Sequence, residues 1–280
     1  MQQRVPDTTF NGQVVIITGA SSGIGAALAC LLADQGACLA LAARSADKLD
    51  AVARECERRG GKAIAATTDV SSEAQCKGLI ERTVQQYGRI DMLVNNAGFT
   101  VAAPFGDLPD LAAFREVIDT NFMGSVYCTY CALPYLKQSQ GRIVAISSLA
   151  GKAPLPFNTA YAASKHAMAG FYDSLRIELA DSGVTVTVAY PDFVVTGFAA
   201  NTRTADGRCW GERLAKRFYT DKMMTADTCA RLVLKAAAHR QRELTTSTRG
   251  KLTGWIKAVS PRLLDRIARA SIRPKRSRPA

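Results

Sequence analysis

The sequence predicts an α/β fold, a doubly wound parallel sheet of about seven strands with helices on both faces. Short apolar, β-branched runs alternate with longer helical segments along most of the 280 residues, which is the pattern of successive βαβ units. A glycine-rich turn separates the first apolar run from the first helical segment. Polar motifs follow several later runs, at the edge where such sheets bind ligands.

The first predicted strand, residues 13–17, runs into TGASSGIG at 18–25, which opens a long Ala/Leu-rich helix. Gly19, Gly23 and Gly25 permit a tight turn and a close approach of the backbone to a ligand. The helix N-terminus behind them presents free N–H groups to a pyrophosphate. The GxxxGxG spacing differs from the usual GxGxxG of dinucleotide-binding turns.

The second predicted strand, residues 37–43, bears on the choice of cofactor. In dinucleotide-binding folds an acid closing this strand accepts from the ribose 2′-OH, whereas a base accommodates a 2′-phosphate. Ala43 stands where the acid would be and Arg44 follows, so the sequence favours NADPH over NADH. The alternative is that Arg44 is an ordinary surface arginine.

The remaining elements follow the same alternation. They are predicted as helix 46–59, strand 62–67, helix 72–87, strand 91–94, one or two helices over 109–136, strand 141–147, helix 159–181 and strand 184–189. Asp69-Val70 and the NNAG motif at 95–98 each follow a strand, and Asn121 lies inside a helical segment.

The stretch 141–166 carries the best candidates for chemistry. Its strand ends at Ser148, and the following helix places Tyr161 and Lys165 one turn apart on one face. A nearby ammonium stabilises a phenolate, which predicts a tyrosine pKa below its usual value of about 10. Such a hydroxyl can give a proton to a carbonyl or take one from an alcohol, and Ser148 is placed to hydrogen-bond the same oxygen. The alternative is that both are ordinary helix residues.

Cysteine usage and hydropathy indicate a cytoplasmic protein. No stretch reaches the roughly 18 apolar residues of a membrane span, and residues 1–12 show no secretory signal. Eight cysteines in a chain of this length do not predict a disulfide scaffold, and they fit a reducing compartment. Cys128 and Cys131 form a CxxC inside a helical run, where core packing explains them better than a metal or redox site. We expect no metal site.

The C-terminal tail is strongly basic. Residues 249–280 carry +9 of the net charge of +12, so we divide the chain into a catalytic domain at 1–248 and a basic amphipathic helical tail at 249–280. An apolar face containing Trp255 with a basic rim is typical of a helix lying on an anionic membrane surface. Docking onto the body, a dimer contact and a solvated basic end remain as alternatives. Nucleic-acid binding is not expected, because the body is not basic.

In this order and spacing, the motifs resemble the short-chain dehydrogenase/reductase (SDR) family over about residues 10–245. The resemblance rests on TGASSGIG (18–25), DV (69–70), NNAG (95–98), Asn121, Ser148, YAASK (161–165) and PDFVVT (191–196). It implies a Rossmann-type fold and an NADP(H)-dependent oxidoreductase that interconverts a carbonyl and a secondary alcohol by hydride transfer. TADG at 204–207 and the basic end are similar to a membrane-associated, lipid-directed subgroup.

The resemblance also implies residue roles. Tyr161 would be the acid/base, Lys165 would lower its pKa and bind the nicotinamide ribose, Ser148 would polarise the substrate oxygen, and Asn121 would hold a relay water. The implied cofactor contacts are Thr18, Gly19, Ser21, Ser22, Gly23, Ile24, Gly25, Arg44, Asp69, Val70, Asn95, Ala97, Gly98, Tyr161, Lys165, Pro191, Val194 and Thr196.

Two positions depart from the family pattern. Asp192 replaces the glycine that usually follows the proline, which bears on the loop shaping the substrate mouth. Ser22 stands where many NADP-preferring members carry a basic residue beside Gly23, which weakens the argument for NADP.

The substrate is predicted to be bulky and apolar: a lipid, acyl chain, steroid or aromatic ketone. A lid at about 196–225 contains Phe198, Trp210, Phe218, Tyr219, Met223 and Met224. The predicted substrate contacts are Ser148, Leu149, Phe157, Tyr161, Phe193 and Phe198. The alternative is that the lid aromatics only hold the lid down.

Three other functions are compatible with parts of the sequence. One is an NAD-dependent alcohol dehydrogenase of the same family. A non-catalytic dinucleotide-binding sensor would be expected to have lost one of Asn121, Ser148, Tyr161 and Lys165, and all four are present. The third is a peripheral membrane adaptor. The resemblance also implies a homodimer or homotetramer formed through the helices at 109–136 and 159–181.

Overall fold

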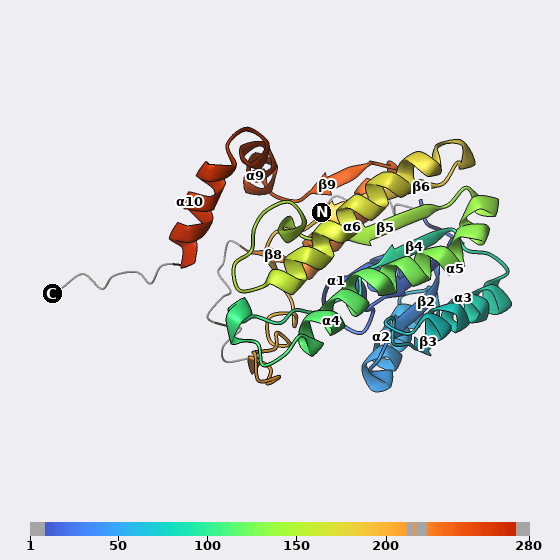
Figure 1. The fold of residues 1–280 in the computed structure, drawn as a ribbon. Helices are drawn as coiled ribbons and strands as arrows, with labels where there is room; N and C mark the ends of the chain where they lie inside the picture. The colour runs from blue at the N-terminus through green and yellow to red at the C-terminus, as the bar shows by residue number, and fades with distance from the viewer. Residues whose placement is uncertain (1–8, 212–215, 217–222, 273–280) are drawn as a thin grey trace, which may run out of the picture.

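A computed structural model of the chain describes residues 9–211, 216 and 223–272. Its centre is a parallel sheet of seven strands in the order β3-β2-β1-β4-β5-β6-β9 (Figure 1). The strands are β1 Val14–Thr18, β2 Cys38–Ala43, β3 Lys62–Thr67, β4 Met92–Asn95, β5 Arg142–Ile146, β6 Thr185–Tyr190 and β9 Glu243–Thr245. The strand order reverses between β1 and β4, which opens a crevice at their carboxyl ends. The predicted doubly wound sheet is confirmed.

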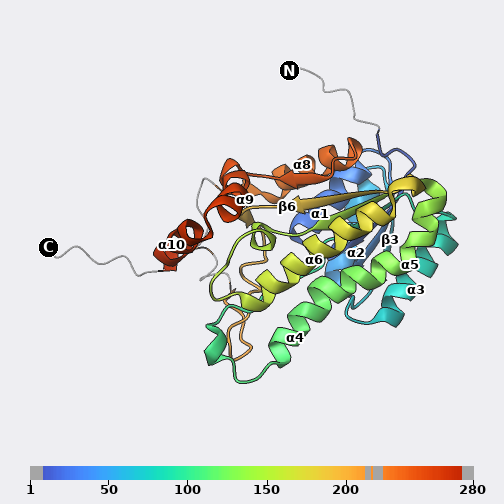
Figure 2. The same ribbon diagram turned by 45° about the horizontal axis from the view of Figure 1, so that its top comes forward.

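Helices cover both faces of this sheet (Figure 2). They are α1 Gly23–Ala33, α2 Ala46–Arg58, α3 Glu73–Tyr87, α4 Ala112–Ile118, α5 Gly124–Ser139, α6 Thr159–Glu178, α8 Ala226–Ala238, α9 Thr248–Val259 and α10 Pro261–Ile272. Helices α1, α2 and α8 pack on one face, and α3, α5 and α6 pack on the other. Strand β1 is therefore buried along its whole length, with Ile17 in one core and Ile16 in the other.

The helical segment predicted at 109–136 is interrupted in the structure. A π-helical turn, Asp119–Met123, joins α4 to α5 and contains the fully buried Asn121. Such turns often occur at functional sites. The periodicity of the sequence predicted the helices, but it did not predict the π-helical turn, whose hydrogen bonds run from i to i+5.

Two short strands, β7 Val194–Val195 and β8 Met224–Thr225, pair in parallel and bring the two ends of the predicted lid together. Within the lid, Arg203 forms bridges to Val101 and to Cys209. Phe218 and Tyr219, which the sequence placed in the lid, lie outside the described residues.

Helices α9 and α10 lie at the carboxyl edge of the sheet, and α10 projects away from it (Figure 1). Ser260 separates the two helices, and Pro261 begins α10. The first turn of α9 is docked on the body, because Gly250 is buried and a Cβ there would lie 2.4 Å from Cδ2 of Leu149. Among the helices described, none is long and apolar enough to cross a bilayer.

Candidate active site

A cavity of about 1090 Å³ runs along the carboxyl ends of the central strands. The predicted residues that line it are Gly19, Ser21, Ser22, Gly23, Ile24, Arg44, Asp69, Val70, Ala97, Gly98, Ser148, Phe157, Tyr161, Lys165, Pro191, Phe193, Val194, Thr196 and Phe198. Five others, Thr18, Gly25, Asn95, Asn121 and Leu149, lie behind its wall. Residues scattered over 180 positions of sequence thus meet in one space.

The glycine-rich turn is shaped by contacts that exclude side chains. Gly19 has φ +66°, and a Cβ there would lie 2.8 Å from the Cα of Ala97. A Cβ on Gly25 would lie 2.4 Å from the carbonyl oxygen of Gly19. Ser22 makes no side-chain cap to α1, and the first turn of α1 contains no acidic residue. The uncapped N–H groups and the positive end of the helix dipole suit a pyrophosphate.

Thr18 and Asn95 hold the floor of the cavity rather than lining it. The Thr18 hydroxyl accepts hydrogen bonds from the backbone N–H groups of Asn96 and Ala97, at 3.0 and 3.1 Å. The Asn95 amide donates to Thr129 at 3.0 Å and to the Tyr172 hydroxyl at 2.8 Å. Both residues fix the loop after β4, which brings Ala97 to the cavity.

One end of the cavity is basic. Arg44, directly after β2, lines it together with Lys48 in the first turn of α2, and both side chains are exposed. Asp69 also lines this end, but its carboxylate accepts from the Ser71 N–H and hydroxyl, at 3.0 and 2.7 Å. Burial raises the pKa of Asp69, yet these hydrogen bonds and the Arg44 charge outweigh it and lower the pKa overall. Lys48 was not predicted from the sequence, because Arg44 precedes the N-cap of α2 and helical spacing does not relate the two residues.

Tyr161 and Lys165 meet at the middle of the cavity, in the electrostatic setting of a buried site. The Lys165 ammonium is 3% exposed, donates to the Ile146 carbonyl at 2.8 Å and lies 5.6 Å from the Tyr161 ring centre. Burial lowers the pKa of Lys165 to about 7. Burial raises the pKa of Tyr161 to about 12, against the opposing effect of a hydrogen bond with the Ser148 side chain. The lowered tyrosine pKa expected from the spacing is therefore not found, because burial dominates and only the Ser148 hydrogen bond opposes it.

Asn121 stands behind this pair. Its amide donates to the Phe99 carbonyl at 2.9 Å and to the Ser164 hydroxyl at 3.1 Å, and its oxygen accepts from the Phe99 N–H. Gly98 separates Asn121 from Lys165, since a Cβ there would lie 3.0 Å from Asn121 Oδ1 and 3.7 Å from Lys165 Nζ. The absence of a side chain at Gly98 is what lets these two groups approach one another.

The other end of the cavity is apolar. Phe157, Phe193 and Phe198 line it, and Phe198 packs on Tyr161 with ring centres 5.6 Å apart. Further apolar lining residues are Phe99, Leu155, Pro156, Trp210 and Met223. Leu149, predicted as a substrate contact, instead packs under Gly250 of α9.

Asp192 joins the mouth of the cavity to α9. Its carboxylate accepts from the Ser247 hydroxyl at 2.7 Å and from the Arg249 guanidinium at 2.5 Å. Ser247 also caps α9 through the Gly250 N–H, and the Arg249 guanidinium lies 5.5 Å from the Phe193 ring centre. The sequence shows that Asp192 departs from the family pattern. It does not indicate the partners of Asp192, because these are more than 50 residues away.

Comparison with known proteins supplies the family. The pattern of the short chain dehydrogenase family matches residues 13–207. The chain belongs to this family. An 11-beta-hydroxysteroid dehydrogenase-like protein (4A) of Arabidopsis thaliana is 37% identical over 255 residues, covering 91% of this chain and 83% of the relative. The 11-beta-hydroxysteroid dehydrogenase 1A of the same plant is 37% identical over 264 residues, covering 91% and 74%. A dehydrogenase/reductase SDR family protein 7-like of Dictyostelium discoideum is 34% identical over 266 residues, covering 93% and 82%.

The short-chain dehydrogenase is thus an oxidoreductase that uses a nicotinamide dinucleotide, as the resemblance implied. Its uncapped α1 N-terminus, its two close-packed glycines and the basic end of the cavity fit such a cofactor. Among the described residues, no group of three or more His, Cys, Asp or Glu side chains is arranged to hold a metal ion. All eight cysteines are free.

Proposed function

We propose that this dehydrogenase uses NADP(H) to interconvert a bulky apolar ketone and its secondary alcohol. The observation that carries the proposal is the polarity of the cavity, which has two cations at one end and aromatic side chains at the other. Tyr161, Ser148 and Lys165 lie where the two ends meet.

The preference for the phosphorylated cofactor rests on Arg44 and Lys48. A 2′-phosphate carries close to two negative charges at neutral pH, and two cations lining the same cavity suit it. Ala43 offers no carboxylate to accept from a ribose 2′-OH, and Asp69 is occupied by Ser71. Lys48 supplies the second charge that Ser22 does not.

The proposed chemistry assigns the proton to Tyr161. When bound, the cofactor supplies or accepts the hydride at the carbinol carbon. A tyrosine pKa of about 12 keeps the phenol protonated at neutral pH, which is the form that reduction needs to protonate the carbonyl oxygen. Ser148 donates a hydrogen bond to the same oxygen. Lys165 and Asn121, on either side of Gly98, form the path by which the proton is replaced.

The substrate end has no charge available for an acidic substrate among the described lining residues. Arg203 pairs with Glu116 at 2.7 Å and lies 4.7 Å from the Phe99 ring centre, and Asp192 is held by Ser247 and Arg249. Neutral polycyclic ketones and hydroxysteroids fit such a wall. The names of the relatives, which include hydroxysteroid dehydrogenases, support this substrate class.

Thermal stabilisation by NADPH and by NADH at matched concentrations tests the cofactor assignment, because a ligand that binds only the folded state raises its stability. We expect the larger shift with NADPH. Arg44→Ala with Lys48→Ala should weaken NADPH binding by about 10- to 100-fold, since a hydrogen bond to a charged group contributes about 1.5–3 kcal/mol, while NADH binding stays unchanged. Arg54→Ala, an exposed α2 arginine outside the cavity, is the control. A larger shift with NADH supports the NAD-dependent alternative, and no shift with either cofactor contradicts a dinucleotide site and supports the peripheral membrane adaptor.

We propose a homodimer or homotetramer formed through α5 and α6, where the exposed Tyr130 and Ile177 offer apolar contacts. Sedimentation of wild type and of Ile177→Glu tests it, with dissociation expected in the variant. The free cysteines support a cytoplasmic location.

A further inference from the structure

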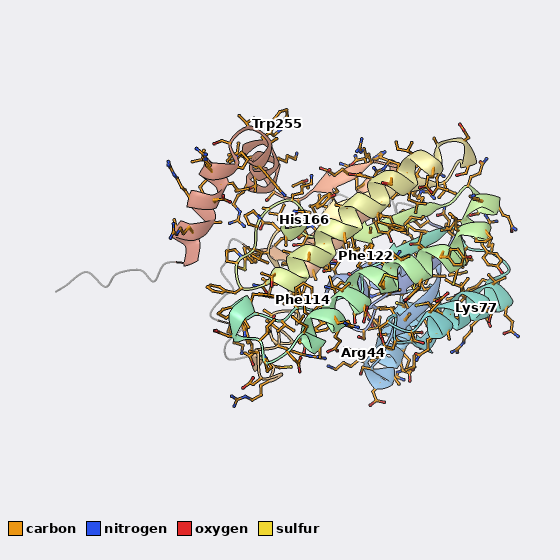
Figure 3. The ribbon with its side chains drawn as sticks, viewed as in Figure 1. Arg44, Lys77, Phe114, Phe122, His166 and Trp255 are labelled. Carbon is orange, nitrogen blue, oxygen red and sulfur yellow. The ribbon has the colours of Figure 1, made fainter. Side chains whose placement is uncertain are left out.

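Helices α9 and α10, called here the C-terminal arm, expose an apolar face. On α9, Leu252, Trp255 and Val259 share the side opposite the buried Gly250, and Trp255 and Val259 are 73% and 80% exposed. On α10, Leu263 and Ile267 are exposed as well, at 45% and 49%, while Leu264 is buried. Figure 3 shows Trp255 pointing away from the body and far from Arg44. Such a face costs free energy in water unless something covers it.

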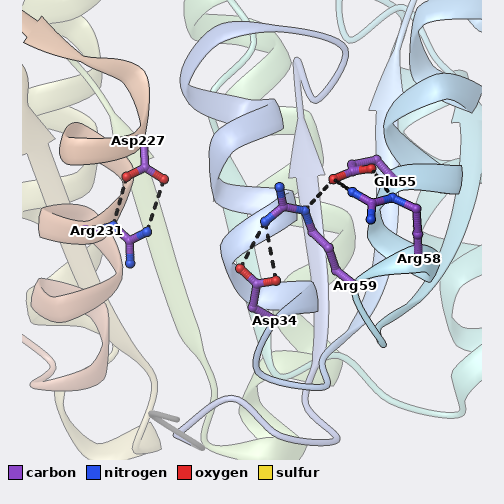
Figure 4. A network of polar contacts seen from close by, with 6 residues as sticks. All are labelled: Asp34, Glu55, Arg58, Arg59, Asp227 and Arg231. Carbon is purple, nitrogen blue, oxygen red and sulfur yellow. Dashed lines mark hydrogen bonds and ion pairs between the residues drawn. The ribbon is translucent and has the colours of Figure 1, made fainter. Parts of the chain in front are cut away.

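The arm also carries unbalanced positive charge. Of its six cations, Arg249 pairs with Asp192, and the other five, Lys251, Lys257, Arg262, Arg266 and Arg269, accompany the single acid Asp265. Over the described part of the chain, none of these five forms an ion pair, although Lys257 contacts His166 at 2.9 Å. Some arginines of the body are paired instead: Arg59 bridges Asp34 and Glu55, and Arg231 pairs with Asp227 (Figure 4).

We propose that the C-terminal arm docks on a membrane that contains anionic lipids. Exposed Trp and aliphatic side chains flanked by Lys and Arg are what binds a helix in the interfacial plane, and each cation near an anionic surface contributes about 1 kcal/mol. A second copy of this chain is the less suitable occupant, because a symmetric contact would bring two basic arms together.

The position of the arm gives docking a use. Asp192 ties α9 to the loop that carries Phe193, so the arm is fastened at the mouth of the apolar end of the cavity. An arm lying on a bilayer would hold this mouth near the surface in which an apolar substrate dissolves. Only this use rests on the proposed substrate; docking itself depends on neither substrate nor cofactor.

Co-sedimentation of the full chain with vesicles tests the proposal. We expect binding to vesicles of phosphatidylcholine with phosphatidylglycerol, weakening with added salt, and little binding to phosphatidylcholine alone. Leu252→Glu with Trp255→Glu should abolish binding. Leu111→Glu is the control, because Leu111 and Leu252 are both 59% exposed and Leu111 lies before α4, outside the arm.

Charge reversal separates a local basic surface from overall charge. Arg262→Glu with Arg266→Glu should weaken binding at least about tenfold, since two cations contribute about 2 kcal/mol between them. Arg54→Glu with Arg82→Glu makes the same change in net charge on α2 and α3 and should bind like the wild type. NADPH-induced thermal stabilisation verifies the fold of every variant, independently of vesicle binding.

Three results would overturn the proposal. The first is no binding of the wild type to anionic vesicles at low salt. The second is equal binding by the arm variants and their controls. The third is a dimer that Trp255→Glu dissociates, without vesicle binding by the wild type, which would make the face an interface between copies.

Discussion

The two ends of the cavity are built in different ways. The cofactor end is made of strand ends and backbone, with Gly19 and Gly25 packed so closely that a methyl group would not fit. The apolar end is made of side chains on loops, among them Phe157 and Phe193, and Phe157 has the unusual φ of +65°. Substitutions at the first end should act through steric exclusion, and those at the second through lost contact area. Tyr161 and Lys165 lie between the two ends, and substitutions there should change both the proton transfer and the electrostatics of the site.

The largest effect is expected at this junction. Tyr161→Phe should lower turnover of an apolar ketone with NADPH by about 10²- to 10⁴-fold, because the proton donor is lost. Thermal stabilisation by NADPH should stay close to that of the wild type. Tyr130→Phe, which removes an exposed hydroxyl from α5, is the control for initial rates. Turnover within tenfold of the wild type would refute the acid/base assignment.

A single added methyl group at the cofactor end should prevent cofactor binding. In Gly25→Ala the new Cβ would lie 2.4 Å from the Gly19 carbonyl, so the turn must move, at a cost of about 1–3 kcal/mol, and NADPH stabilisation should be lost. Gly78→Ala on α3 meets nothing within 4 Å and should stabilise the protein by about 0.4–1 kcal/mol. Urea unfolding with and without NADPH measures both. Similar behaviour of the two variants would contradict the steric argument.

Burial of Lys165 should appear in the pH dependence of stability. Its pKa is about 7 in the folded protein against a usual 10.5, so the unfolded chain binds more protons between these values. The free energy of unfolding should therefore rise with pH across that window, by at most about 1.4 kcal/mol per pH unit, and be constant below it for this group. Lys165→Met should remove this contribution. Urea titrations from pH 6 to about 9.5 compare the slopes, and equal slopes would show that burial does not perturb Lys165.

The smallest effect is expected at the apolar end. Phe193→Ala should raise KM for an apolar ketone about fivefold, because losing about 1 kcal/mol of apolar contact weakens binding by that factor, with kcat and NADPH binding unchanged. Phe105 is equally exposed, at 56%, but does not line the cavity, so Phe105→Ala is the matched control. A changed NADPH affinity in Phe193→Ala would mean that the two ends are not separable.

Local features of the sequence were enough to predict the family, the class of sheet, six of its strands and the helices between them, but not α8 or β9. Apolar runs and helical periodicity depend on neighbouring residues, and the glycines of the first turn by themselves indicate a tight backbone conformation. Prediction failed where a distant segment decides the outcome. Leu149 follows a catalytic-looking serine, yet α9 covers it from 100 residues away. Lys48 becomes a lining residue only because α2 turns that face toward the crevice.

The sequence by itself determined the α/β fold, the family and the set of groups that can do chemistry. Only the tertiary structure decided the pKa values of Tyr161 and Lys165. Burial is the largest cause of both shifts, and it depends on the whole chain rather than on the spacing of the two residues. The bond of Asp192 to Ser247 and Arg249, and the outward direction of the apolar face of the arm, are likewise tertiary. Periodicity shows that a helix has an apolar face, but only packing shows which side of the helix meets the body and which side meets solvent.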